Sequence, residues 1–142
     1  MDFTIFTFFV DLFFKIFPFL PHKNKQLEAF KEQFKSVAFQ EFYSNLSGEK
    51  IIILMTNIFG TNIHSEGLLK LREIKQYNLH KKDKRLIRKF IDLFDKMIQY
   101  EELEKNSYIK YKEKLTRGNV IQDLYNDIKK VMNDAKSKWS AD

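Results

Sequence analysis

The first 21 residues constrain this chain most, because they are almost entirely apolar and aromatic. Eight of the chain's 15 Phe residues lie between Phe3 and Phe19. If the segment is helical, at about 100° per residue, its polar side chains share one narrow stripe. That stripe consists of Thr4, Thr7, Asp11 and Lys15. Apart from the terminal Asp2, the rest of the helix surface is apolar and needs an apolar environment on nearly every side.

The length of this segment limits how it can meet a bilayer. Pro18 and Pro21 are expected to end the helix, since Pro lacks the backbone N–H and clashes with the preceding turn. Residues 2–17 then reach roughly 24 Å, which is shorter than the ~30 Å hydrocarbon core. The segment lacks the basic start and small-residue cleavage site of a signal peptide. We therefore predict a hydrophobic N-terminal membrane-anchor helix in residues 1–21, which spans a thinned bilayer or lies in its interface.

Five side chains are predicted to carry insertion: Phe3, Phe6, Phe9, Phe13 and Phe17. Cationic residues, Lys23 and Lys25, follow the segment directly, and the positive-inside rule then places the body of the protein on the cytoplasmic side. Two alternatives stay open for the same helix. It is buried in an oligomer of this chain, or it is covered by the chain's own core.

Residues 22–142 have the composition of a basic helical domain. Hydrophobic residues make up 44% and charged residues 31% of the whole chain, which indicates a folded core. With only 4 Gly and 2 Pro, a strand-rich fold with many tight turns is disfavoured. The absence of Cys excludes disulfides, thiolate zinc sites and Cys nucleophiles.

Apolar residues in this domain recur at three- and four-residue spacing, which predicts an all-α fold with a small bundle of about five helices behind the N-terminal helix. The expected ranges are 25–46, 50–59, 66–77, 83 to about 105, and 119–138. Ser65 and Asp83 are the predicted N-caps of the third and fourth helices. The apolar run 50–59 contains three consecutive Ile residues, yet no partner strand is apparent, so a helix is favoured over a strand.

The core face of the first body helix is predicted from its spacing alone. Its members are Leu27, Phe30, Phe34, Val37, Ala38, Phe42 and Leu46. The fourth helix has the strongest pattern, from Leu86 to Ile98, and the last helix is expected to bury Trp139.

No motif in the sequence indicates catalysis. The three His residues stand apart, with no pair at metal-binding spacing, and no phosphate-binding Gly loop is present. Carboxylate pairs such as Asp92 and Asp95 fall opposite the apolar stripe of their helix, where solvated faces explain them, and the cluster around Glu101 is interpreted the same way. We expect a non-enzymatic protein with no cofactor and no metal.

One basic cluster rises above the background. Six cations lie within nine residues, opposed only by Asp83: Lys81, Lys82, Lys84, Arg85, Arg88 and Lys89. Cations near a helix N-terminus are unfavourable by about 0.3–1 kcal/mol each, which an anionic partner would offset. With Lys23 and Lys25, this cluster is predicted to bind an anionic lipid surface. Nucleic-acid phosphates, an acidic protein and plain solvation of the charges are the alternatives.

Three functional hypotheses follow. The first is a membrane-associated protein whose body binds a partner protein, as an inhibitor, immunity or regulatory subunit does. The second is a helical nucleic-acid-binding protein that uses the 81–89 cluster. The third is a homo-oligomer that permeabilises membranes through its N-terminal helix, with the polar stripe lining the assembly.

Overall fold

The computed structural model describes residues 23–58, 60–76, 79–107 and 120–140. Within these ranges the chain forms six α-helices and no strand, which confirms the all-α prediction. The order is α2 (Lys23–Glu32), the 3-10 turn η2 (Gln33–Lys35), α3 (Val37–Ser44), α4 (Gly48–Ile58), α5 (Ile63–Lys75), α6 (Lys81–Ser107), α8 (Val120–Ala135) and the π-helical turn η3 (Lys136–Ser140). The predicted N-terminal helix lies outside the described residues.

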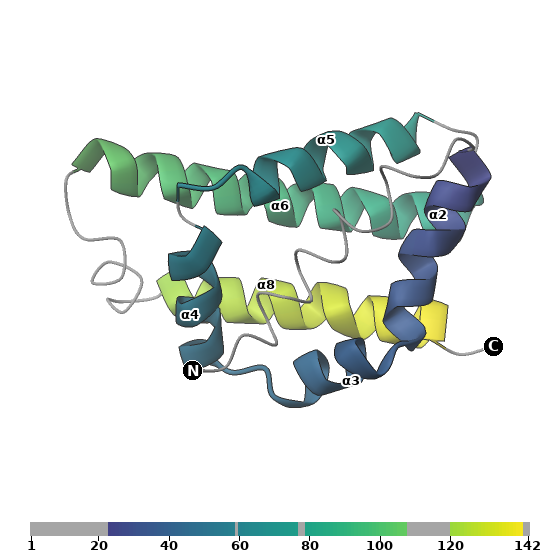
Figure 1. Ribbon diagram of the computed structural model, residues 1–142, viewed down its shortest axis with the longest axis horizontal. Coiled ribbons are helices and arrows are strands. Elements are labelled where there is room, and N and C mark those ends of the chain that lie inside the picture. The colour runs from purple at the N-terminus through teal and green to yellow at the C-terminus, as the bar shows by residue number, and fades with distance from the viewer. Residues whose placement is uncertain (1–22, 59, 77–78, 108–119, 141–142) are drawn as a thin grey trace.

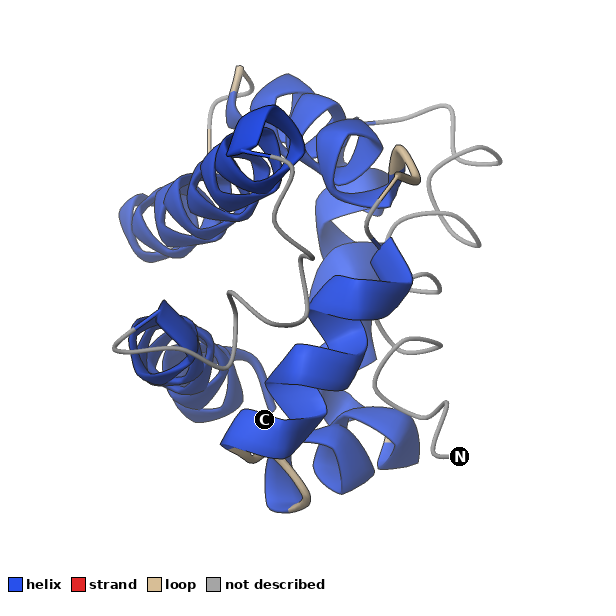
Figure 2. Cartoon of the chain, turned by 90° about the vertical axis from the view of Figure 1, so that its left-hand side faces the viewer, coloured by secondary structure: helices blue, strands red, loops and turns tan. Residues whose placement is uncertain are grey.

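The long helix α6 is the spine of the fold (Figure 1). Its 27 residues extend about 40 Å. Helix α5 packs along it, and α8 lies across from α5 and runs antiparallel to α6. Helix α4 packs on α8, while α2 and η2 meet η3 at the opposite end. Figure 2 shows the described part as helices joined by loops.

An aromatic cluster forms the core where α2, η2, α6 and η3 meet. Phe30 is fully buried, and its ring centroid lies 5.4 Å from Phe34, 5.3 Å from Phe90 and 5.6 Å from Trp139 in edge-on contacts. Phe90 and Trp139 stack with an interplanar angle of 2°. Edge-on and stacked rings each add about 0.5–1.5 kcal/mol beyond the burial of apolar area. This cluster therefore holds α2 and η3 against the first half of α6.

The predicted single helix over 25–46 is interrupted, and this prediction was wrong. Ser36 has extended backbone angles (φ −78°, ψ 157°), and its hydroxyl donates to the Gln33 carbonyl (2.7 Å) and accepts from the Phe39 N–H (3.1 Å). Ser36 is thus the N-cap of α3. The break changes the phase of the following helix, so Val37 and Ala38, which were expected in the core, are exposed.

Other helix boundaries were predicted with mixed success. Residues 50–58 of this run are helical as predicted, and residue 59 lies outside the described residues. Helix α4 begins at Gly48, where the Ser47 hydroxyl accepts from the Lys50 N–H, and it ends at Ile58, shortly before Gly60, whose φ is +79°. The predicted caps Ser65 and Asp83 were wrong. Helix α5 starts at Ile63 behind Asn62, and α6 starts at Lys81.

We expect Phe30→Ala to lower the free energy of unfolding by about 3–5 kcal/mol, because it leaves a cavity beneath three other rings. Urea denaturation followed by the fluorescence of Trp139 measures this loss. Val37→Ala, at a side chain 69% exposed, is the control and should change stability by less than about 0.5 kcal/mol. Equal effects of the two substitutions would contradict the aromatic core.

Candidate functional site

Four cations of the predicted basic cluster share one face of α6. We call this face the cationic stripe, and it consists of Lys81, Lys84, Arg85 and Arg88. Spacings of three, four and seven residues place these side chains side by side on a helix. All four are exposed, and together they line an open hollow of about 260 Å³. No ion pair joins any of them to an acidic side chain of the described residues.

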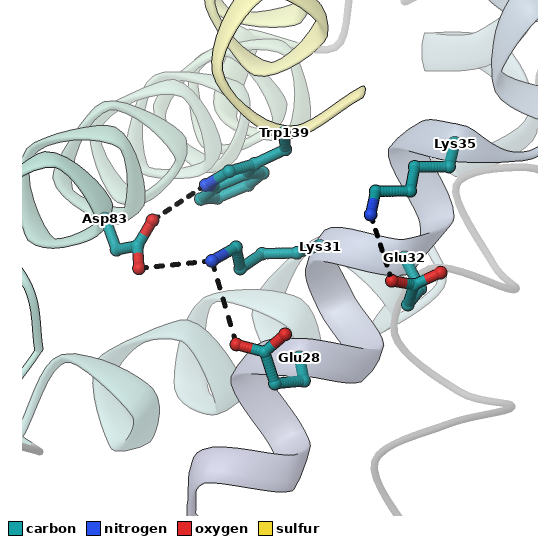
Figure 3. A network of polar contacts seen from close by, with 6 residues as sticks. All are labelled: Glu28, Lys31, Glu32, Lys35, Asp83 and Trp139. Atoms are coloured by element: carbon teal, nitrogen blue, oxygen red, sulfur yellow. Dashed lines mark hydrogen bonds and ion pairs between the residues drawn. The ribbon is translucent and has the colours of Figure 1, made fainter. Parts of the chain in front are cut away.

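The only acid within the cluster, Asp83, is turned away from the cationic stripe. Its Oδ1 accepts from the indole N–H of Trp139 (2.8 Å), and its Oδ2 accepts from the ammonium of Lys31 (3.3 Å), as Figure 3 shows. The Asp83 side chain is only 15% exposed. Both carboxylate oxygens are therefore engaged toward α2 and η3, and the stripe keeps its positive charge.

This network also positions the start of α6. Lys31 belongs to α2, and its ammonium additionally lies 3.7 Å from Glu28 (Figure 3). Trp139 belongs to η3 and is buried in the aromatic core. Asp83 lies in the first turn of α6, where a carboxylate also suits the helix dipole. Two separate segments, α2 and η3, thus hold the first turn of the helix that carries the stripe.

The other members of the predicted cluster are placed differently. Lys82 is exposed but lies about 100° around the helix from Lys81, off the stripe. Lys89 is half-buried and bonds Asp134 of α8 at 2.6 Å, so it holds two helices together. Four of the six predicted cations therefore lie on one surface, the cationic stripe.

The remaining predicted site residues do not join this surface in the described part of the chain. Lys25 is exposed on α2. Lys23 is the first residue of α2, but its side chain is not described. The five predicted insertion residues lie outside the described residues: Phe3, Phe6, Phe9, Phe13 and Phe17.

A buried acid–base pair lies near the other end of α6, and sequence analysis missed it. His64 is 3% exposed, and its Nε2 contacts Glu101 Oε2. Glu101 Oε1 also accepts from the Gly60 N–H at 3.1 Å. The expectation that the Glu101 cluster is a solvated face was thus wrong for Glu101, whose side chain is 15% exposed. One carboxylate joins the α4–α5 connection to α6.

Burial lowers the pKa of His64 below its usual range, and the nearby Glu101 carboxylate only partly opposes this effect. When the His64 imidazole is neutral and carries its proton on Nε2, this N–H donates to the Glu101 carboxylate. Its Nδ1 has no hydrogen-bond partner among the described residues. Protonation would place a buried N–H there without an acceptor, which costs free energy.

Charged side chains farther along α6 form ion pairs with α8 and α5. Lys96 contacts Asp127 across the two helices, and this hydrogen bond raises the pKa of Lys96. Asp95 lies 3.4 Å from Arg72 of α5 at an exposed position. The described residues contain no group of three or more His, Asp or Glu side chains placed to hold a metal ion.

None of the helices that the structure describes is both long and apolar enough to cross a bilayer. Comparison of the chain with protein-family models, with curated proteins and with solved structures finds no match.

We expect the wild-type protein to lose stability as the pH falls below about 6.5, the pKa of an unperturbed His. The folded pKa of His64 is lower, so the unfolded chain binds more protons in this window and acid favours unfolding. The loss stops below the folded pKa of His64. Urea denaturation at a series of pH values measures the slope.

His64→Gln keeps a donor toward Glu101 but cannot titrate, so it should flatten this slope. His80→Gln, at an exposed His, is the matched control and should leave the slope unchanged. An unaltered slope in His64→Gln would show that other groups set the acid sensitivity.

Proposed function

We propose that the protein binds anionic membrane surfaces, with the cationic stripe of α6 facing the lipid headgroups. The observation that carries this proposal is the alignment of four exposed cations on one helix face while the neighbouring acid, Asp83, is engaged on the opposite side. A net charge of +6 supports the same direction of attraction.

The electrostatic attraction of the stripe has the size expected for one of two membrane-binding signals. Each Lys or Arg near an anionic surface contributes about 1 kcal/mol, so the stripe supplies about 4 kcal/mol. That is too little for stable attachment alone, and durable membrane binding generally needs two signals. In this proposal the other signal is the apolar segment 1–21, with its insertion residues predicted from sequence. The body then lies on the cytoplasmic side.

Lipid is favoured over nucleic acid by the composition of the stripe. Proteins that hold single-stranded nucleic acids combine cations with exposed aromatic rings on which bases stack. Between Lys81 and Lys89 there is no aromatic residue, and the next one, Phe90, is fully buried. Lipid headgroup phosphates can bind to the cations alone, without exposed aromatic rings.

Beyond membrane attachment, the hypothesis that the body binds and regulates a partner protein stays a prediction. The permeabilising homo-oligomer rests on residues 1–21 and is tested by dye release from liposomes. Loss of dye release in Asp11→Leu would support it.

We expect Lys81→Gln/Lys84→Gln to weaken binding of the full chain to phosphatidylcholine vesicles containing phosphatidylglycerol by about 20- to 30-fold, which corresponds to about 2 kcal/mol. Co-sedimentation over a lipid titration measures the affinity. Binding to pure phosphatidylcholine should not change, because neutral lipid reports the apolar segment alone. High salt should weaken the wild type toward the variant.

The matched control is Lys130→Gln/Lys138→Gln, which removes the same charge from exposed positions on α8 and η3. It should lose much less affinity than the stripe variant. If the two variants bind alike, net charge rather than the stripe attracts the lipid, and the proposal is wrong. If the stripe variant loses affinity for duplex DNA but not for vesicles, the nucleic-acid hypothesis replaces it.

A further inference from the structure

The cationic stripe lines a compact hollow rather than an extended positive track. Its four cations, Lys81, Lys84, Arg85 and Arg88, span about 10 Å along the axis of α6 and about 100° around it. The hollow has a volume of about 260 Å³, which is below the ~300–1,000 Å³ of sites for drug-sized molecules. An exposed acid, Asp92, follows one turn after Arg88 and lies outside the lining. This surface therefore suits one small anionic group.

Two of the four cations are arginines with unused hydrogen-bond donors. Arg85 and Arg88 are three residues apart, so their side chains are neighbours on one face of α6. Neither has an acidic partner among the described residues, whereas Arg72 of α5 lies 3.4 Å from Asp95. A guanidinium is planar and can donate two parallel N–H bonds to one phosphate group, which a Lys ammonium cannot do. The stripe thus offers directed donors as well as charge.

Four uncompensated cations around one hollow favour a ligand group with more than one negative charge. A phosphomonoester has a second pKa of about 6, so it carries about −1.5 to −2 charges at pH 7 and presents three acceptor oxygens. A phosphodiester, such as that of phosphatidylglycerol, carries a single charge on two terminal oxygens. Because Coulomb attraction grows with the product of the charges, the monoester gains more from the same four cations.

We propose that the cationic stripe recognises the phosphomonoester dianion, with Arg85 and Arg88 donating paired hydrogen bonds to its oxygens while Lys81 and Lys84 add charge. This inference rests on the proposed function, because it names the headgroup chemistry that the stripe prefers. The same group occurs in phosphatidic acid and in soluble molecules such as glycerol 3-phosphate. The experiments below separate these two sources.

Co-sedimentation of the full chain with two kinds of phosphatidylcholine vesicles at about pH 7.5 tests the lipid source. One kind contains phosphatidic acid, and the other contains twice the mole fraction of phosphatidylglycerol, so that the total charge is matched. We expect the phosphatidic acid vesicles to bind about fivefold or more tightly, because each dianion meets both guanidinium groups at once.

The variant Arg85→Lys/Arg88→Lys keeps every charge and removes the planar donors. We expect its preference for phosphatidic acid to fall below about twofold while its affinity for phosphatidylglycerol vesicles stays within about twofold of the wild type. Both positions are exposed, and Arg and Lys have similar helix propensities, so the variant should fold. The matched control is Arg72→Lys, at an exposed Arg on α5, which should keep the wild-type preference.

Nuclear magnetic resonance titration of the full chain with glycerol 3-phosphate tests the soluble source, with dimethyl phosphate as the diester for comparison. We expect the backbone amides of residues 81–88 to shift more with the monoester than with the diester. If these shifts occur without a preference for phosphatidic acid vesicles, the proposal holds for a soluble phosphomonoester and not for a lipid.

Two results would overturn the inference. One is equal binding to the charge-matched vesicles together with no monoester-specific shifts in residues 81–88. The other is a preference for phosphatidic acid that survives in Arg85→Lys/Arg88→Lys. In both cases, stripe-dependent binding to phosphatidylglycerol vesicles still supports the proposed membrane function. A chain that binds no vesicles contradicts that function instead, and the glycerol 3-phosphate titration then decides the inference alone.

Discussion

The carboxylate of Asp83 is the interaction on which the arrangement of this protein most depends. It joins Lys31 of α2 and Trp139 of η3 to the first turn of α6, although these partners are 52 and 56 residues away in sequence. A half-buried carboxylate is costly unless its oxygens are hydrogen-bonded, and here both are. The same two bonds hold the indole in the aromatic core and leave the four cations of the stripe without an opposing charge among the described residues.

The charged side chains of α6 fall into two groups that lie on different faces of the helix. At its start, the cationic stripe faces outward while Asp83 faces inward. Farther along, Lys89 and Lys96 are joined to Asp134 and Asp127 of α8, and Glu101 meets the buried His64. Lys89, Lys96 and Glu101 thus hold α6 against α8 and α5, whereas the charges of the stripe have no acidic partner among the described residues.

Much of the core could be predicted from the sequence, because burial on a helix follows its period. Phe30, Phe34, Phe90, Leu124 and Trp139 all lie where their spacing places them. The cluster of cations was also visible from the sequence. Its division into a free stripe and a bridging Lys89 was not, since that depends on Asp134, which is 45 residues away. Contacts at such separations leave no local pattern.

The His64–Glu101 pair shows the same difficulty. Neither residue has a neighbour in sequence that marks it as buried. Glu101 was interpreted as part of a solvated face, and His64 was given no role. A single His beside a glycine-containing connection, Gly60 to His64, was the only local signal.

The break at Ser36 has a consequence for the shape of the molecule. A continuous helix over residues 25–46 would be a straight rod of about 33 Å with no bend in it. The hydroxyl of Ser36 instead satisfies the backbone on both sides of a bend, so that Phe34 and Phe39 meet across it. The bend that the Ser36 hydroxyl stabilises thus gives this part of the protein a hollow, where a continuous helix would present a ridge.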